Sequence, residues 1–149
     1  MNTKDLVYLL MLLLAGCSTP NMKKEVISTD KAPKAIGPYS QAIRVGDTLY
    51  LAGQIAIDPT TGQMISGGIK AQTRQVLKNI QSVLCAAGFL ITDVVQSQVF
   101  LKDLNDYGMM NDIYEEYFGR NPPVRAVVQV SRIPRDAQIE IMVIATKAR

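Results

Sequence analysis

Two charged residues lie inside apolar segments near the C-terminus, and both are of types that can do chemistry. Arg125 lies in the segment 124–128, and Glu140 lies in the segment 139–144. An arginine presents a planar fork of donors that suits a carboxylate, and a carboxylate can hold or activate a water. The pair therefore indicates an anion-binding pocket with an acid/base group beside it. A structural ion pair, or two side chains that point at solvent, is the alternative.

The elements that must position these charges can be predicted from apolar periodicity and turn residues. Short β-branched segments bounded by turns predict strands, and apolar residues at steps of three and four predict helices. The predicted strands begin near residue 25 and cover about 40–45, 48–52, 94–101, 125–131 and 138–146. The predicted helices cover about 69–87, ending at Gly88, and about 104–118. The resulting order is β-β-β-α-β-α-β-β.

This order predicts an α+β domain, in which a six-stranded, mainly antiparallel sheet carries two helices on one face. The length of 149 residues and the hydrophobic content of 48% fit one globular domain. The second face of such a sheet would still be apolar. We therefore expect it to be buried against another subunit.

The last two strands read as a hairpin that turns at residues 134–136. A symmetric hairpin places Arg125 opposite Thr146 and Glu140 opposite Ser131, with both charges on the same side of the sheet. The two charges are then about six residues, or about 20 Å, apart along the sheet. That distance is too long for one site in one chain. Either a bulge shortens it, or the two groups meet across a subunit boundary.

Composition excludes several kinds of chemistry. The chain has no histidine, which excludes a histidine base, a Ser-His-Asp triad and histidine metal ligands. The net charge of +3 is small and scattered, so we expect no nucleic-acid partner. Two cysteines outside a Cys-x-x-Cys arrangement argue against a zinc or redox site. Cys85, on the first predicted helix, is expected to be a buried structural thiol.

The N-terminal segment resembles a bacterial lipoprotein signal. A short apolar run, residues 6–14, is followed by Leu14-Ala15-Gly16-Cys17, which resembles a lipobox. This predicts a signal peptide at 1–16, a lipidated Cys17 with a tether to residue 24, and a single domain at 25–149. Ser18 resembles the sorting pattern of periplasmic lipoproteins anchored to the outer membrane. The alternative is a start of translation at Met22, which would leave the protein in the cytoplasm.

Several blocks of the chain resemble the reactive intermediate deaminase (RidA, or YjgF) family. They are Ala-Ile-Gly-Pro-Tyr-Ser-Gln-Ala at 35–42, Leu-Ala-Gly-Gln-Ile at 51–55, Asp-Pro-Thr-Thr-Gly at 58–62, Val-Phe-Leu-Lys-Asp-Leu-Asn-Asp-Tyr at 99–107, Pro-Val-Arg-Ala at 123–126 and Ile-Glu-Ile at 139–141. The blocks occur in family order and cover the chain from about residue 26 to residue 147. Several blocks at the right spacing are far more specific than one short pattern.

The resemblance implies a chorismate-mutase-like fold, assembled as a homotrimer with clefts between adjacent subunits. Such clefts would bring the two charges together across a boundary. It also implies hydrolysis of reactive enamines and imines, of the 2-aminoacrylate and 2-iminopropanoate type, to 2-keto acids and ammonia. No metal or organic cofactor is expected, because an imine is already electrophilic.

The resemblance also implies roles for individual residues. Arg125 would bind the substrate carboxylate, and Glu140 would deprotonate the attacking water or pass a proton to the departing amine. Tyr39 would close the pocket and donate a hydrogen bond. The positions that match the lining of the family's pocket are Gly53 and Val127, through their backbones, Tyr107 and Asn111.

Two positions depart from the family pattern. Val127 stands where many members carry a cysteine, and Ala52 stands where many carry serine or threonine. Deaminase activity is expected to survive these changes, with reduced affinity or another preferred substrate. A non-enzymatic ligand-binding or chaperone-like trimer is the alternative function. The endoribonuclease activity ascribed to some members is disfavoured, because the chain lacks histidine and is only weakly basic.

Overall fold

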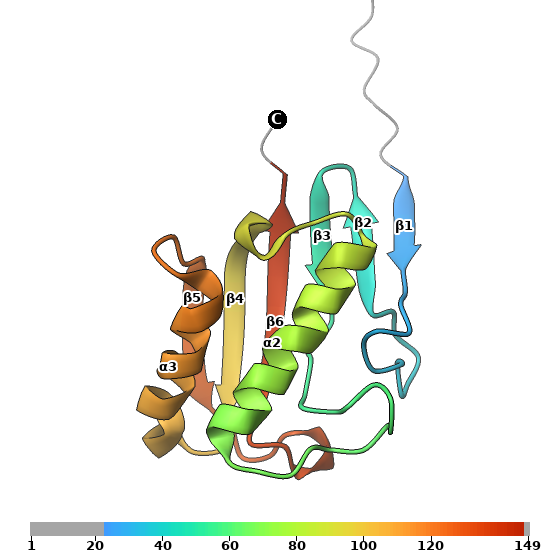
Figure 1. The fold of residues 1–149 in the computed structure, drawn as a ribbon. Helices are drawn as coiled ribbons and strands as arrows, with labels where there is room; N and C mark the ends of the chain where they lie inside the picture. Colours follow the sequence, from blue (N-terminus) through green and yellow to red (C-terminus); the bar gives the residue numbers. More distant parts are fainter. Residues whose placement is uncertain (1–22, 148–149) are drawn as a thin grey trace, which may run out of the picture.

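The computed structural model of the protein describes residues 23–147. Its strands are β1 (Lys24–Ile27), β2 (Ala42–Val45), β3 (Thr48–Leu51), β4 (Val94–Leu101), β5 (Val124–Gln129) and β6 (Ile139–Thr146). Its long helices are α2 (Ile69–Ala86) and α3 (Tyr107–Phe118), and single-turn helices lie at Ile91–Asp93, Leu104–Asp106 and Pro134–Asp136. This is the element order that the sequence predicts, and it confirms the α+β class (Figure 1).

The six strands form one sheet in the order β1-β2-β3-β6-β4-β5. Every neighbouring pair is antiparallel except β4 and β5, which run parallel because α3 returns the chain between them. Both long helices cover the same face of the sheet (Figure 1). The sheet is therefore mainly antiparallel with two helices on one side, as expected.

α2 supplies most of the helix side of the core. Val76, Leu77, Ile80 and Leu84 recur at helical spacing and are fully buried between α2 and the sheet. Gly88 has a φ of 75°, a left-handed conformation that costs glycine little. The helix therefore ends where the sequence predicts.

The predicted hairpin between the last two strands is wrong, because β4 lies between β5 and β6. The connection crosses the end of β4, where the Val130 amide donates to the Leu101 carbonyl and the Lys102 amide donates to the Gln138 carbonyl, both at 2.9 Å. Turn residues show that a chain reverses, but they do not show which strand it pairs with. The parallel return through α3 decided the pairing here.

The face of the sheet opposite the helices is uncovered and largely apolar. One row of paired residues crosses all six strands on this face: Val26, Ile43, Tyr50, Ile144, Gln96 and Val124. Val124 is 70% exposed and Val26 is 61% exposed. The expectation of a second apolar face is thus confirmed, and a surface of this kind is typical of a protein–protein interface.

The expectation for Cys85 is wrong. Its side chain is exposed on the outer surface of α2, one position beyond the buried Leu84. The predictions for residues 1–16, for the lipidated Cys17 and for most of the tether lie outside the described residues. Between residues 23 and 147, no helix is long and apolar enough to cross a membrane.

Candidate active site

Glu140 lies in β6 beside a cavity of about 400 Å³. Its carboxylate makes no hydrogen bond or ion pair with any of the described residues. Burial raises the pKa of the Glu140 carboxyl above its ordinary value. A half-buried carboxylate with a raised pKa and free oxygens can accept a proton from a bound water.

Gly53 lies directly against this carboxylate. A Cβ atom at Gly53 would overlap Oε1 of Glu140, so any larger residue there would have to displace the carboxylate from this position. The next residue, Gln54, exchanges two backbone hydrogen bonds with Ile141, at 2.8 and 3.0 Å. These bonds hold the chain after β3 against β6, and so they fix the narrow approach between Gly53 and Glu140.

Tyr39 lines the same cavity from the loop between β1 and β2. A tight turn, in which the Tyr39 amide donates to the Gly37 carbonyl at 2.8 Å, directs the side chain back over the loop. The Tyr39 hydroxyl accepts a hydrogen bond from the Ile36 amide at 3.3 Å. Its own proton remains available to a ligand in the cavity. The structure thus brings together three predicted residues: Tyr39, Gly53 and Glu140.

Arg125 lies in β5 beside a different cavity, of about 480 Å³. Its guanidinium lies 4.5 Å from the centre of the Tyr114 ring and 5.7 Å from that of Tyr107. It also donates to the Tyr107 hydroxyl at 3.3 Å. Arg125 forms no ion pair with a carboxylate among the described residues. Its positive charge is therefore available to an anionic ligand.

Asn111 and Tyr107 complete this second group. Asn111 lines the cavity together with Arg125, and its Oδ1 atom is buried without a hydrogen-bond partner among the described residues. Interaction with the Asn111 side chain, and then the charge of Arg125, lower the pKa of the Tyr107 hydroxyl. Two helical residues one turn apart thus surround the arginine with polar groups. The structure brings together Arg125, Tyr107 and Asn111.

Val127 belongs to neither group. Its side chain packs against the main core, two residues after Arg125 on the same face of β5. It lines neither the cavity beside Arg125 nor the cavity beside Glu140. The remaining predicted position, Cys17, lies outside the described residues.

Arg125 and Glu140 lie on opposite faces of the sheet, so the prediction that they share a side is wrong. Arg125 pairs with Ser97 of β4, and Glu140 pairs with Phe100 of the same strand. Paired residues share a face, and residues three apart on one strand point to opposite faces. Ser97 is fully buried beneath the helices, which places Arg125 on the helix side and Glu140 on the open side. The predicted pairing of these charges with Thr146 and Ser131 fails with the hairpin.

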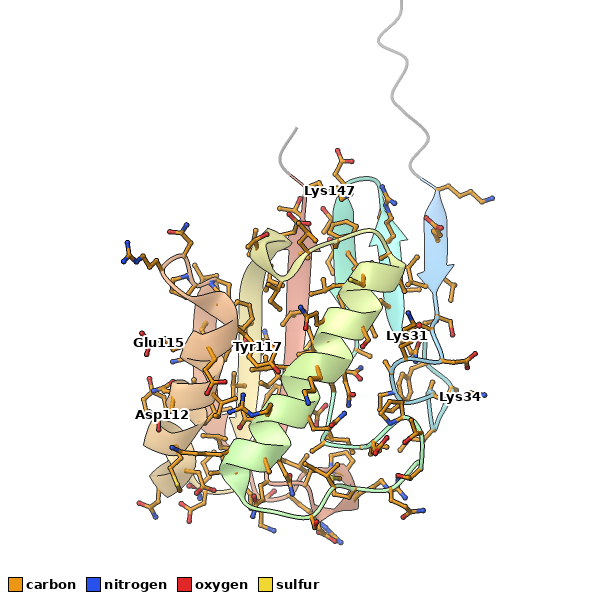
Figure 2. All side chains as sticks on the ribbon, in the orientation of Figure 1. Lys31, Lys34, Asp112, Glu115, Tyr117 and Lys147 are labelled. Atoms are coloured by element: carbon orange, nitrogen blue, oxygen red, sulfur yellow. The ribbon has the colours of Figure 1, made fainter. Side chains whose placement is uncertain are left out.

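The two cavities are also far apart across the sheet. Figure 2 labels one wall residue of each: Glu115, from the cavity beside Arg125, lies on α3 at the left edge of the view. Lys34, from the cavity beside Glu140, lies in the loop after β1 at the right edge. One chain therefore separates the two charges, and no single cavity contains both.

Sequence reasoning missed two residues of these groups. Tyr114 stacks under Arg125, and it follows Tyr107 and Asn111 at steps of four and three along α3. That spacing puts the three side chains on one helix face and could have identified it. Gln54 is buried and lines the cavity beside Glu140. The only signal for it in the sequence is its place in the family-like block at 51–55.

Among residues 23–147, no group of three or more histidine, cysteine, aspartate or glutamate side chains is arranged to hold a metal ion. The donors and acceptors of both cavities come from tyrosine, asparagine, glutamine, lysine, arginine and glutamate side chains and from backbone. These groups can bind a carboxylate, orient a polar ligand and exchange a proton with water.

Known proteins resemble this chain over nearly all of its described length. The family model described as Endoribonuclease L-PSP matches residues 29–147. A RutC family protein of Pyrococcus horikoshii is 57% identical over 124 residues, which cover 83% of this chain and 98% of that protein. The human 2-iminobutanoate/2-iminopropanoate deaminase is 49% identical over 122 residues, which cover 82% of this chain and 89% of that protein.

A solved structure supports the same assignment. The crystal structure of a Yersinia pestis protein of the Rid family, YyfA, has a TM-score of 0.81 and a sequence identity of 47%. The match covers 84% of this chain and all of that one. The chain therefore belongs to the Endoribonuclease L-PSP family, the family of the reactive intermediate deaminases that its motifs resemble.

Proposed function

We propose that the protein hydrolyses small 2-imino acids, and the enamines in equilibrium with them, to 2-keto acids and ammonia. One observation carries the proposal: an arginine without a carboxylate partner and a carboxylate without a cation partner each line a cavity. These are the two groups that a 2-imino acid needs, an anion site and a base for water. The human relative, named for deamination of 2-iminobutanoate and 2-iminopropanoate, supports this substrate class.

The complete site forms between subunits. Within one chain, Arg125 and Glu140 lie on opposite faces of the sheet, so a second copy must supply one of them. The apolar open face, with Tyr50, Val124 and Val128 exposed, supplies the surface that another copy would bury. A homotrimer with one cleft at each subunit boundary satisfies both requirements, because a ring uses the same interface three times.

The reaction needs no redox step. Arg125 holds the substrate carboxylate with charge-assisted hydrogen bonds, and Glu140 takes a proton from water as the oxygen attacks the imine carbon. The imine nitrogen takes a proton from solvent, and a carbinolamine forms. Glu140 then gives its proton to the amine, and the C–N bond breaks as the carbinolamine hydroxyl releases its proton to solvent, so that ammonia leaves and the keto acid remains.

The other residues orient the substrate. Tyr39 donates its free hydroxyl proton to the ligand, and Gly53 leaves room for the reacting groups beside Glu140. Tyr107 and Asn111 hold the end of the cleft where the carboxylate binds.

Two other functions would use the same fold. A non-catalytic trimer that binds carboxylates would need Arg125 but would have no use for a raised pKa at Glu140. The family description names an endoribonuclease. Neither the net charge of +3 nor the absence of histidine favours RNA cleavage by this chain.

We further propose that the protein is an outer-membrane lipoprotein that faces the periplasm, anchored through Cys17. The lipobox-like residues 14–17 and Ser18 support this location. Fractionation of cells that express the full-length chain, beside Cys17→Ala, tests it. The wild type is expected in the membrane fraction, and Cys17→Ala, which cannot be acylated, is expected outside it. Wild-type protein in the cytosol would instead favour a start of translation at Met22.

The deaminase proposal is tested by the release of 2-oxobutanoate from freshly generated 2-iminobutanoate. The full-length wild type is expected to accelerate release above spontaneous hydrolysis, and Arg125→Ala is expected to abolish the acceleration at substrate concentrations well below KM. Arg74→Ala is the matched control, because it removes an arginine that pairs with Glu116 on the outer surface of the helices. No acceleration by the wild type, with carboxylate binding intact, would give the lead to the binding-protein function.

A further inference from the structure

Buried oxygens without partners gather around Arg125. Four buried side-chain polar atoms have no hydrogen-bond partner within the described part of the chain, and they belong to Ser97, Asn111, Tyr114 and Gln138. Three of these four residues adjoin Arg125: Ser97 pairs with it across the sheet, Tyr114 lies under its guanidinium, and Asn111 lines its cavity. Such atoms are costly in a core, so their concentration at one residue calls for a functional reason.

Of the two aromatic rings beside the guanidinium, the Tyr114 ring has the nearer centre. Its ring centre lies 4.5 Å from Cζ of Arg125, compared with 5.7 Å for Tyr107. Tyr114 is only 4% exposed, and its ring packs 4.3 Å from that of Phe118. Tyr107, by contrast, is 42% exposed at the start of α3. The ring that is held rigidly by the core is therefore the one beneath the arginine.

A second buried hydroxyl, that of Ser97, lies in the neighbourhood of this ring. Burial raises the pKa of Tyr114, and interaction with the Ser97 hydroxyl, followed by the charge of Arg125, opposes that rise. Ser97 is fully buried on β4 directly beside β5. Arg125 therefore has the Tyr114 ring beside its guanidinium and Ser97 beside its backbone on the neighbouring strand.

An aromatic ring holds an arginine in a way that a carboxylate cannot. A carboxylate partner would orient the guanidinium but would neutralise it and compete with an anionic ligand. A ring attracts the cation through its quadrupole and leaves the donor fork and the net charge free. Orientation without neutralisation is what a carboxylate-binding arginine requires.

We infer that Tyr114 is a positioning residue whose ring, packed against Phe118 in the core, holds the Arg125 guanidinium ready for the substrate carboxylate. This inference rests on the proposed function for the identity of the ligand. It predicts that the strength with which carboxylates bind follows the electron density of the ring at position 114.

The test measures binding of 2-oxobutanoate, the keto acid product, to the full-length chain by calorimetry. Tyr114→Leu removes the ring and is expected to weaken binding about tenfold. Tyr114→Phe keeps the ring and is expected to recover most of the affinity. Replacing Tyr114 with 3,4,5-trifluorophenylalanine keeps the shape of the ring but withdraws electrons from it. The affinity of this variant for 2-oxobutanoate is expected to lie between those of Tyr114→Leu and Tyr114→Phe.

The matched control is Tyr117→Leu. Tyr117 lies on the same helix, but its hydroxyl donates to the Arg74 carbonyl and it does not touch Arg125. This variant should bind 2-oxobutanoate like the wild type. In the deaminase assay, Tyr114→Leu should raise KM about tenfold and change kcat far less, because the Tyr114 ring acts on carboxylate binding through Arg125.

The outcomes separate the inference from the proposed function. A graded loss of binding supports the positioning role, even if the wild type does not deaminate 2-iminobutanoate, which would overturn the function alone. Equal affinity of the fluorinated and unfluorinated rings would overturn the inference, and so would an unchanged affinity of Tyr114→Leu. If Tyr114→Leu does not fold, comparison of Tyr114→Phe with the trifluorophenylalanine variant still tests the inference. Absence of binding by the wild type would overturn both.

Discussion

The cavity beside Glu140 is walled by loops and by close backbone approach, whereas the cavity beside Arg125 is walled by side chains of one helix. Gly53 and the loop that carries Tyr39 line the cavity beside the carboxylate, and the hydrogen bonds between Gln54 and Ile141 hold the segment after β3, which contains Gly53, to β6. Around Arg125, α3 supplies Tyr107, Asn111 and Tyr114 from one face.

The difference matches the two tasks. A group that moves a proton must be held within a fraction of an ångström of the reacting atoms, and backbone contact provides that precision. A group that binds an anion must keep its charge and reach, and aromatic rings provide an environment that does not neutralise it. The two halves also face opposite sides of the sheet, so under the proposed function each acts only beside a neighbouring copy.

The largest expected effect separates the two halves by kinetic parameter. Glu140→Gln should lower kcat about 100- to 10,000-fold with a small change in KM, because it removes the base but not the anion site. Arg125→Ala should act mainly through KM, because it removes the carboxylate contact. Steady-state kinetics with 2-iminobutanoate measure both. If both variants changed kcat and KM in the same way, the two residues would not have the separate tasks of base and anion site.

A smaller loss is expected when the backbone wall is disturbed. Gly53→Ala places a methyl group 1.9 Å from Oε1 of Glu140 and must displace the carboxylate, so kcat should fall about 100-fold. Gly108→Ala is the control, because a Cβ there meets nothing within 4 Å. Gly108→Ala should keep full activity and stabilise α3 by about 0.5–1 kcal/mol. Thermal unfolding and kinetics of both variants are the measurement.

Mixing two inactive chains sharpens the comparison further. Arg125→Ala and Glu140→Gln subunits, unfolded and refolded together in equal amounts, should recover about one quarter of wild-type activity. In a ring, a site is intact only where the chain that supplies the arginine carries Glu140→Gln and its neighbour carries Arg125→Ala. Activity that stays at the level of the separate variants would show that the two halves do not meet between subunits.

The smallest effect concerns stability and pH. Burial raises the pKa of Glu140 in the folded state. The folded protein therefore loses stability as the pH rises from the pKa of the unfolded state, about 4.3, through the higher pKa of the folded state. Glu140→Gln should therefore raise the melting temperature slightly at pH 7. The corresponding gain in the free energy of unfolding is less than about 1 kcal/mol after allowance for solvent screening. The gain should vanish below about pH 4. If Glu140→Gln were still more stable than the wild type below that pH, the gain would come from packing and not from the carboxylate charge.

Local patterns predicted most of the fold. The apolar spacing of α2, its end at Gly88, and the strand at Val94–Leu101 all follow from contacts between residues close in sequence. Such contacts depend on steric and hydrogen-bonding preferences that a short segment carries with it. The same holds for membership of the two charges in strands.

Pairing between distant segments could not be predicted in this way. The turn at 134–136 suggested a hairpin, yet β4 lies between β5 and β6. This one change moved Arg125 and Glu140 to opposite faces and made Ser97 the partner of the arginine. Likewise, Cys85 is exposed although it follows a fully buried leucine, since only the packed helix decides which side faces solvent.

By itself, the sequence determined the residue types that can do the chemistry, the elements that carry them and the family motifs around them. Only the tertiary structure decided that Glu140 lies against Gly53, that Arg125 rests on Tyr114, and that one chain keeps the two charges apart. The physical reason is that side-chain chemistry and local periodicity are properties of the chain. Register and facing are set by which distant strands pair, and that depends on the packing of the whole sheet against α2 and α3.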